Sequence, residues 1–353
     1  MKKQVNRRDF VKGLVFGGST LGLGAGLLAG TATQQSPKRV MFASRRTHAV
    51  PEISRVALVK GNDRRRNMLK ALEMIEPQIK EGIKNKQVVI KPNFTRVRAQ
   101  DWLASTHVDN TSALCECLSS FYRGKITIAE GTGPGTPLQE ALDSYEYTSL
   151  RKRYNVEFYD LRSDDCLVTY ILNKDLDPVR LRVSKLLLDP YTYLISAAVL
   201  KTHSLAVVTL GLKNVVMAAP MNFGGSENDR GRMHKDKVSD NPRAFNFNLF
   251  QMSCHVVPDL VTIDGFVGME GNGPLTGDPV ESKLAIASTD WLAADRVGTE
   301  VMGFDFGRIG HLRYCAQAEM GEASLSKIEI VGEAIGNCRR SYNPPSSLKS
   351  ILM

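Results

Sequence analysis

The sequence predicts an α/β protein in which a mainly parallel sheet carries helices on both faces, in one large domain or in two lobes. Three observations support this prediction. The chain has 353 residues, more than one compact core usually holds. Its composition, with 42% hydrophobic and 24% charged residues, is that of a globular protein. Short apolar runs alternate with segments of helical periodicity, which is the pattern of a parallel sheet with crossover helices.

The strands are predicted from short apolar runs rich in Val, Ile and Leu. They are 56–59, 88–90, 126–129, 156–159, 193–199, 260–263, 284–287 and 328–331. Helices are predicted between them where apolar residues recur at three- and four-residue spacing. They are 68–83 with an interruption at Pro77, 111–122, 138–154 and 205–218. The glycine-dense segment 264–274 and the polar segment 222–241 are predicted to be loops.

The net charge of +9 is concentrated at the amino-terminal end of the chain. Residues 1–66 hold 14 Lys and Arg against 3 Asp and Glu, whereas the remaining 287 residues hold 32 against 34. A nucleic-acid-binding domain would carry its basic residues on the folded part of the chain. We therefore expect no nucleic-acid partner.

The amino terminus has the pattern of an export signal. Arg7 and Arg8 are followed by Phe10 and then by the uncharged, glycine-rich run 13–30. This arrangement resembles the signal of the twin-arginine translocation pathway. It implies contact with the translocation machinery, a periplasmic or cell-envelope location, and no stable membrane insertion after cleavage. The predicted organisation is a signal peptide at 1–32, a linker at 33–52, an α/β domain at 53–335 and a tail at 336–353.

The six cysteines include no pair with C-x-x-C spacing. Zinc ribbons and ferredoxin-type iron–sulfur loops need such pairs. The sequence therefore encodes no ferredoxin-type motif.

Polar side chains follow five of the predicted strands at the point where each strand ends. They are Lys91 and Asn93, Glu130, Lys201 and His203, Asp264, and Asp290. Ligands of open parallel sheets bind at the carboxyl ends of the strands. We therefore expect these residues to line one crevice.

Lysines and histidines in this set predict a cationic pocket for a small anionic molecule. His203 and His234 are candidate acids and bases, because imidazole titrates near neutral pH. Lys213 interrupts an apolar segment and is the third catalytic candidate. The candidate residues for binding a cofactor are Lys91, Asn93, Lys201, Asn214 and Glu130.

Asp264 and Glu270 lie in a glycine-dense segment and are the candidate metal ligands, together with His203 and His234. The same groups can instead act as general acid and base. Their spacing matches no fixed metal motif.

Several motifs occur in the order found in one uncharacterised prokaryotic family. They are Lys91-Pro92-Asn93, Lys201-Thr202-His203, Gly211-Leu212-Lys213-Asn214, His234, Asp264-Gly265 and Met269-Glu270-Gly271-x-Gly273-Pro274, with Asp290 and Asp295 further on. Over about residues 53–305 the chain resembles the family called domain of unknown function 362. The resemblance names no reaction. Many members look like iron–sulfur proteins with an appended ferredoxin-like segment, a property that this chain does not share.

The order His203, Lys213, Pro220 is also similar to the cofactor segment of the lactate racemase family. That family uses a nickel pincer cofactor tethered to a lysine between two α/β lobes. The resemblance implies a tether at Lys213, a ligand or base at His203 and a second base at His234.

Three functions therefore stay open. The first is an exported enzyme acting on a small anionic substrate, with or without a divalent metal or a lysine-tethered cofactor. The second is a periplasmic binding or cofactor-carrying protein without turnover. The third is a structural or assembly factor of the envelope, in which the pocket residues are incidental. An isomerase of the nickel-pincer type is a more specific form of the first function.

Overall fold

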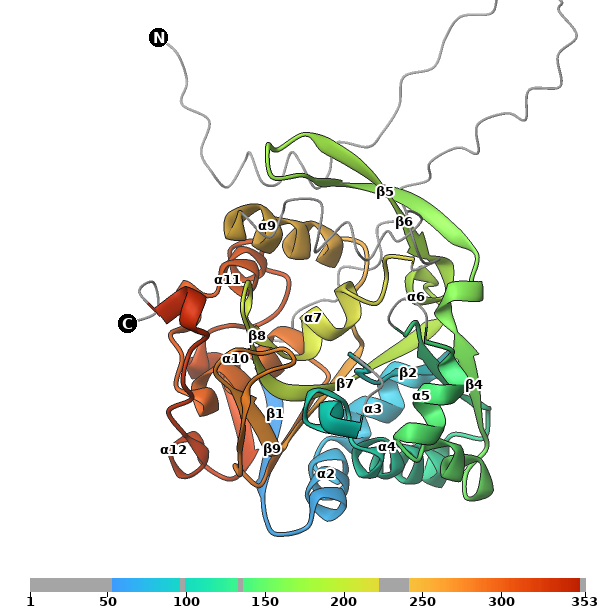
Figure 1. The fold of residues 1–353 in the computed structure, drawn as a ribbon. Helices are drawn as coiled ribbons and strands as arrows, with labels where there is room; N and C mark the ends of the chain where they lie inside the picture. Colours follow the sequence, from blue (N-terminus) through green and yellow to red (C-terminus); the bar gives the residue numbers. More distant parts are fainter. Residues whose placement is uncertain (1–52, 96–98, 133–135, 222–240, 350–353) are drawn as a thin grey trace, which may run out of the picture.

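The computed structural model describes residues 53–95, 99–132, 136–221 and 241–349. Most strands join one large sheet in the order β12-β1-β11-β9-β7-β2-β3-β4, with β8 and β10 attached to β7 and β9 (Figure 1). Along that path β11 alone runs antiparallel to its neighbours. The strands are β1 Ser54–Lys60, β2 Gln87–Lys91, β3 Ile126–Glu130, β4 Val156–Asp160, β7 Thr192–His203, β8 Val207–Thr209, β9 Leu260–Glu270, β10 Asp278–Val280, β11 Leu284–Ser288 and β12 Ile328–Gly332.

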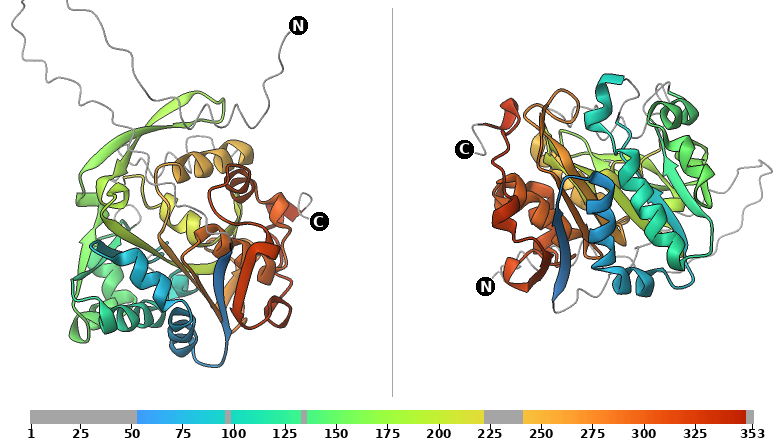
Figure 2. Two further views of the ribbon diagram at one scale, coloured as in Figure 1. Left: turned by 180° about the vertical axis from the view of Figure 1, so that it is seen from behind. Right: turned by 90° about the horizontal axis from the view of Figure 1, so that it is seen from below.

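Helices cover both faces of this sheet, as predicted (Figure 2). One face packs against α2 Arg64–Glu73, α3 Glu76–Ile83, α4 Val108–Phe121 and α5 Leu138–Ser144. The other face packs against α6 Lys185–Leu188, α7 Gly211–Val216, α9 Pro242–Ser253, α10 Trp291–Met302 and α11 Gly310–Gln317. The short α12 spans Ile335–Cys338. The α/β class is thus confirmed, with the described elements arranged around one continuous sheet, while a division into two lobes is not confirmed.

Local sequence explains where several helices begin and end. Pro77 lies in the first turn of α3, so the interruption predicted there separates α2 from α3. The helix predicted over 138–154 is shorter than expected. It ends at Ser144, and the 3₁₀ helix Tyr147–Lys152 follows. Glu146 between them has φ +61°, a left-handed conformation that α-helices do not accommodate.

Two predicted boundaries are wrong for the same reason. Strand β7 continues through Lys201 and His203 instead of ending before them, and β9 continues to Glu270 through the segment predicted as a loop. Both extensions are paired, β7 with β8 and β9 with β10 and β11. The helix predicted over 205–218 is likewise only α7, because β8 occupies its first part. Backbone pairing outweighs local side-chain polarity in these segments.

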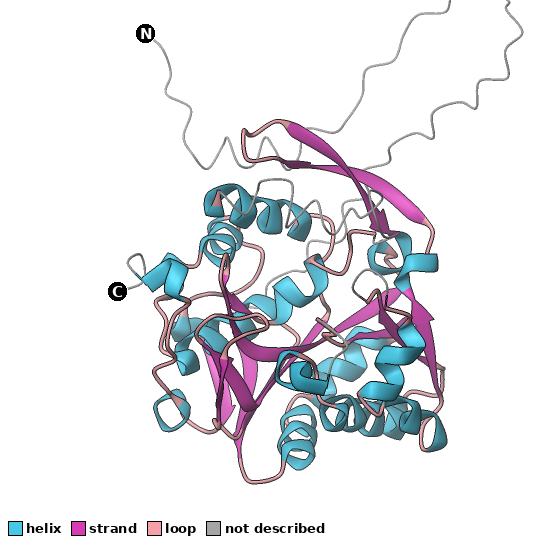
Figure 3. Cartoon of the chain, viewed as in Figure 1, coloured by secondary structure: helices cyan, strands magenta, loops and turns pink. Residues whose placement is uncertain are grey.

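A β-hairpin that the sequence did not predict arches over α9 (Figure 3). It consists of β5 Cys166–Leu172 and β6 Pro178–Ser184. Asn248 of α9 bonds both backbone groups of Leu172, accepting from its N–H at 2.9 Å and donating to its carbonyl at 2.7 Å. The hairpin is thereby fixed to the body of the protein.

The carboxyl-terminal segment is tied to the turn that follows β9. The Glu270 carboxylate accepts from the backbone N–H and the side-chain amide of Asn343, at 2.8 and 2.6 Å. Further along, Ser346 donates to Asn272 and Ser347 donates to the carbonyl of Ser204 at 3.1 Å. Residues of the predicted tail therefore reach the strand that carries His203.

The signal peptide and the linker predicted over 1–52 lie outside the described residues. Within the described part of the chain, no helix has the length and apolar character needed to cross a membrane. All six cysteines are free thiols in this structure.

Candidate active site

Three buried lysines meet near the carboxyl ends of β2, β3 and β7. Lys91 ends β2, Lys201 lies near the end of β7, and Lys213 lies on α7. Their exposed fractions are 3%, 1% and 5%, so water cannot solvate their charges. Their charges interact, since Lys91 lowers the pKa of Lys213, and both Lys91 and Lys213 lower that of Lys201. We call these three residues the lysine cluster.

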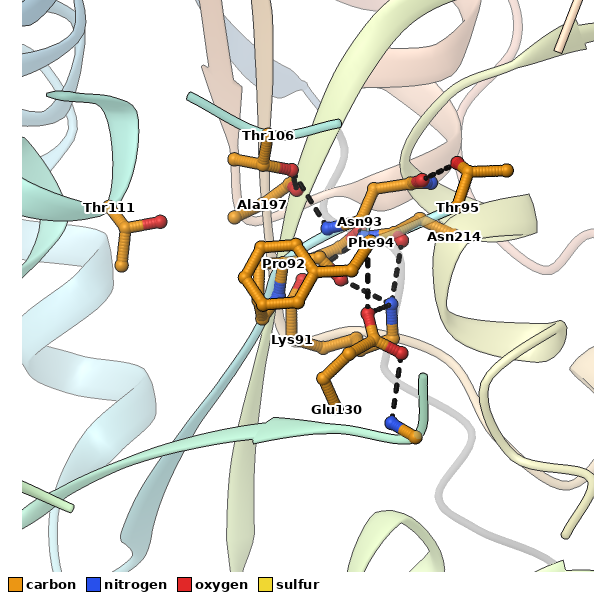
Figure 4. Close-up of polar contacts among 12 residues, drawn as sticks. Lys91, Pro92, Asn93, Phe94, Thr95, Thr106, Thr111, Glu130, Ala197 and Asn214 are labelled. Atoms are coloured by element: carbon orange, nitrogen blue, oxygen red, sulfur yellow. Dashed lines mark hydrogen bonds and ion pairs between the residues drawn. The ribbon is translucent and has the colours of Figure 1, made fainter. Parts of the chain in front are cut away.

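Lys91 is held by a complete set of acceptors (Figure 4). Its ammonium donates to Glu130 at 2.6 Å, to the side-chain oxygen of Asn214 at 3.0 Å, and to the Pro92 carbonyl. Glu130 also accepts from the backbone N–H groups of Phe94 and Gly131, at 3.1 and 2.9 Å. Lys91 and Glu130 therefore form a buried, hydrogen-bonded ion pair.

Asn214 links this ion pair to the neighbouring strand. Its amide nitrogen donates to the Lys91 carbonyl and to the Ser196 hydroxyl, both at 3.0 Å. Ser196 in turn donates to the Gly211 carbonyl at 2.8 Å. Both polar atoms of the Asn214 amide are thus committed to protein partners.

Lys201 is also saturated by protein acceptors. It donates to Thr95 at 2.9 Å, to the side-chain oxygen of Asn93 at 3.3 Å, and to the Ala104 carbonyl. Burial and the two neighbouring lysines hold its pKa well below the ordinary value. Lys201 thus organises the segment that follows β2.

Lys213 differs from the other two lysines. Within the described residues its ammonium makes neither a hydrogen bond nor an ion pair, and it lies 5.9 Å from the centre of the Phe245 ring. Burial, together with Lys91, lowers its pKa to about 7. Lys213 therefore exists as both ammonium and free amine at neutral pH.

The position of α7 is set by a buried carboxylate on α10. Asp295 accepts from the backbone N–H groups of Gly211 at 2.7 Å and Leu212 at 3.0 Å. These groups open the turn that carries Lys213 and have no partner within the helix. Burial raises the pKa of Asp295 to about 7 despite these two bonds.

His203 lies beside the same aromatic ring as Lys213. Its ring stacks on Phe245 with 5.9 Å between centroids. Nδ1 accepts from the backbone N–H groups of Leu205 and Ala206, at 3.1 and 3.3 Å. In the neutral ring the proton is therefore on Nε2.

The sequence analysis missed His311, a buried histidine on α11. Its Nδ1 lies 3.0 Å from the side-chain oxygen of Asn246, which also accepts from the His311 backbone N–H at 3.1 Å. Burial and the charge of Lys213 lower its pKa to about 3. His311 follows no strand and belongs to no local motif, so only the packing of α9 against α11 could reveal it.

The candidate metal ligands do not come together. Asp264 lies on the opposite face of the sheet, paired with Arg64 at 3.3 Å, and Glu270 binds Asn343. In the part of the chain that the structure describes, no group of three or more His, Cys, Asp and Glu side chains is placed to hold a metal ion. His234 falls within 222–240, outside the described residues, so its predicted role is untested.

Asp290 is not part of the crevice. It follows β11, whose antiparallel direction brings its end to the opposite edge of the sheet, beside the start of β1. There Asp290 caps α10 and accepts from the Ser54 hydroxyl at 2.5 Å. The prediction that Asp290 lines the crevice is therefore wrong, because β11 runs antiparallel to its neighbours.

Comparison with known proteins places the chain in context. The sequence model of a family described as domain of unknown function (DUF362) matches residues 88–300. A protein named thylakoid-associated protein sll1697, from Synechocystis, is 34% identical over 125 residues, which are 35% of this chain and 36% of that protein. The match therefore spans about a third of the relative's length. A crystal structure of a Thermotoga maritima protein overlaps with a TM-score of 0.38 at 13% identity, over 74% of this chain and 59% of that one.

Proposed function

This chain belongs to the family described as domain of unknown function (DUF362), and from that premise we propose that it is an exported enzyme acting on a small anionic substrate beside Lys213. The observation that carries the proposal is the difference among the three lysines. Lys91 and Lys201 each donate to three protein acceptors, which uses every N–H of an ammonium. Within the described residues Lys213 donates to none, which leaves it available to a ligand.

The charge of the site favours an anion. The lysine cluster contains three amines, and Glu130 is the carboxylate that hydrogen-bonds to it among the described residues. An anion beside Lys213 would supply the missing negative charge in a region shielded from water, where electrostatic attraction is strong. A carboxylate or a phosphate has the charge and the acceptor oxygens required.

The same residues can move protons. An acid–base catalyst works best when its pKa lies near the operating pH, and the pKa of Lys213 is about 7. His203 provides a second exchangeable proton on Nε2 near the same aromatic ring. Lys213 and His203 are therefore the acid–base candidates of the proposed enzyme.

Proton uptake on binding tests the proposal. At pH 8 most Lys213 side chains are neutral, and an adjacent anion should raise their pKa and draw in a proton. We expect lactate or phosphate to bind the full chain with uptake approaching one proton per site. The measurement is calorimetry in two buffers of different ionisation enthalpy.

Matched variants define the outcomes. Lys213→Met should lose the proton uptake, whereas Lys327→Gln, which changes an exposed lysine, should retain it. Equal uptake by Lys213→Met and the parent would contradict the proposed site. Turnover would be seen by NMR as exchange of the carbon-bound protons of lactate for deuterium. If small anions bind but none of those tried is converted, the result would favour a binding protein.

Export is the second part of the proposal and rests on Arg7, Arg8 and the uncharged run that follows. We expect the parent chain in the periplasmic fraction and a variant with Arg7→Lys and Arg8→Lys in the cytoplasm. Cell fractionation with immunodetection distinguishes them. Equal export of both chains would remove the twin-arginine assignment.

A further inference from the structure

Lys213 has the surroundings of a nucleophilic amine. An amine attacks carbon only in its neutral form, and burial beside other cations favours that form. Lys213 is buried near Lys91 and Lys201, and among the described residues it lies against an aromatic ring instead of a carboxylate. Lys213 is 5% exposed, so it is not completely closed off from solvent.

We infer that Lys213 forms a covalent imine with the carbonyl group of a small 2-oxo acid. This inference rests on the proposed function and specifies its substrate class. The carboxylate of a 2-oxo acid supplies the anion that the lysine cluster attracts, and the adjacent carbonyl carbon supplies the electrophile. In a 2-oxo acid the carboxylate is bonded directly to the carbonyl carbon, so one small molecule presents both groups to Lys213.

The reaction balances without an oxidant or a reductant. The Nζ lone pair of Lys213 adds to the carbonyl carbon, the C=O π electrons move to oxygen, and that oxygen gains a proton as Nζ loses one. The second Nζ proton then passes to the hydroxyl of this carbinolamine, the carbon–oxygen bond breaks with loss of water, and the nitrogen lone pair forms the C=N bond.

Lys91 and Lys201 are internal controls for this reaction. Both are buried lysines of the same cluster, but their ammonium groups are bound by three acceptors each. Attack on a carbonyl would require them to break those bonds. The imine should therefore form on Lys213 and not on its two neighbours.

Reductive trapping tests the inference. The full chain is incubated with pyruvate and sodium cyanoborohydride, which reduces an imine to a stable secondary amine, and the modified residue is identified by peptide mass spectrometry. We expect one adduct, on Lys213, forming about tenfold faster or more than with uncharged methyl pyruvate. At low pyruvate concentration, where the unliganded chain predominates, the labelling rate should rise with pH around a midpoint of about 7, as Lys213 loses its proton.

The controls separate this inference from the proposed function. Lys213→Arg keeps the charge but should lose the adduct, and Lys327→Gln should label as the parent does. Labelling spread over surface lysines, or none on Lys213 in the parent, would overturn the imine. If lactate still drives proton uptake in that case, the anion site stands and only the covalent step fails. Absence of both the adduct on Lys213 and the lactate-driven proton uptake would contradict the anion site itself.

Discussion

The two edges of the sheet use polar side chains in opposite ways. At one edge, Asp290 accepts hydrogen bonds from Ser54, Leu292, Ala293 and Glu322, so its carboxylate is saturated. At the other edge, the three amines of the lysine cluster lie close together, and Lys213 makes no hydrogen bond within the described residues. A polar residue after a strand is therefore no sign of function by itself. The direction of the strand and the saturation of the side chain distinguish a structural role from a functional one.

The largest expected effect is the loss of the charge that balances Lys91. Glu130→Gln would leave a buried ammonium without its carboxylate, which costs about 3–5 kcal/mol of unfolding free energy. Urea denaturation measures it. Glu157→Gln is the matched control, because Glu157 pairs with Lys125 at the surface and should cost no more than about 1 kcal/mol. Equal losses of unfolding free energy in the two variants would mean that the Lys91–Glu130 ion pair does not stabilise this edge of the sheet.

Lys213 should reduce stability in a pH-dependent way. The pKa of Lys213 is about 7 in the folded protein and 10.5 in the unfolded chain. Burial of this side chain therefore does not lower the unfolding free energy above pH 10.5, and the loss of unfolding free energy grows until the pH falls to about 7. Lys213→Met should therefore be more stable than the parent by a few kcal/mol at pH 6, and the difference should shrink toward pH 10. Urea denaturation at pH 6, 8 and 9.5 measures the difference. A constant difference across that range would contradict the depressed pKa.

The smallest expected effect is at the opposite edge. Asp290→Ala removes a helix cap and two further hydrogen bonds, and should cost about 1–3 kcal/mol. It should leave proton uptake and pyruvate labelling unchanged. Asp305→Ala, which removes the exposed cap of a short 3₁₀ helix, is the control and should cost less. Altered labelling in Asp290→Ala would show that the two edges are not independent.

Much of the fold could be predicted, because each buried strand is a run of apolar and β-branched residues. The extents of β7 and β9 could not, since Lys201, His203 and Asp264 are polar residues that nevertheless lie buried in paired strands. In the hairpin that was missed, Arg180 and Arg182 interrupt the apolar pattern of β6, whereas β5 is an apolar, strand-like run that the prediction overlooked. Pairing with β8, and with β10 and β11, decides how far β7 and β9 extend.

The candidate site was predicted in part. Lys91, Asn93, Glu130, Lys201 and Asn214 do lie together with Lys213, because parallel strands bring their carboxyl ends to one edge. The saturation of Lys91 and Lys201 could not be foreseen, as it depends on Thr95, Ala104 and Pro92 carrying acceptors to the right places. Asp264 and Glu270 separate because they lie six residues apart on the extended strand β9, which is about 20 Å at the usual rise per residue.

The attachment of the carboxyl-terminal segment has a practical consequence for handling this protein. Ser347 bonds the carbonyl of Ser204, the residue next to His203, and Asn343 holds the turn after β9. An affinity tag fused at the carboxyl terminus would disturb these hydrogen bonds. A tag fused at the amino terminus would precede Arg7 and Arg8 of the predicted export signal. The turn between β5 and β6, at residues 173–177, is far along the chain from both and is the better place for an epitope tag.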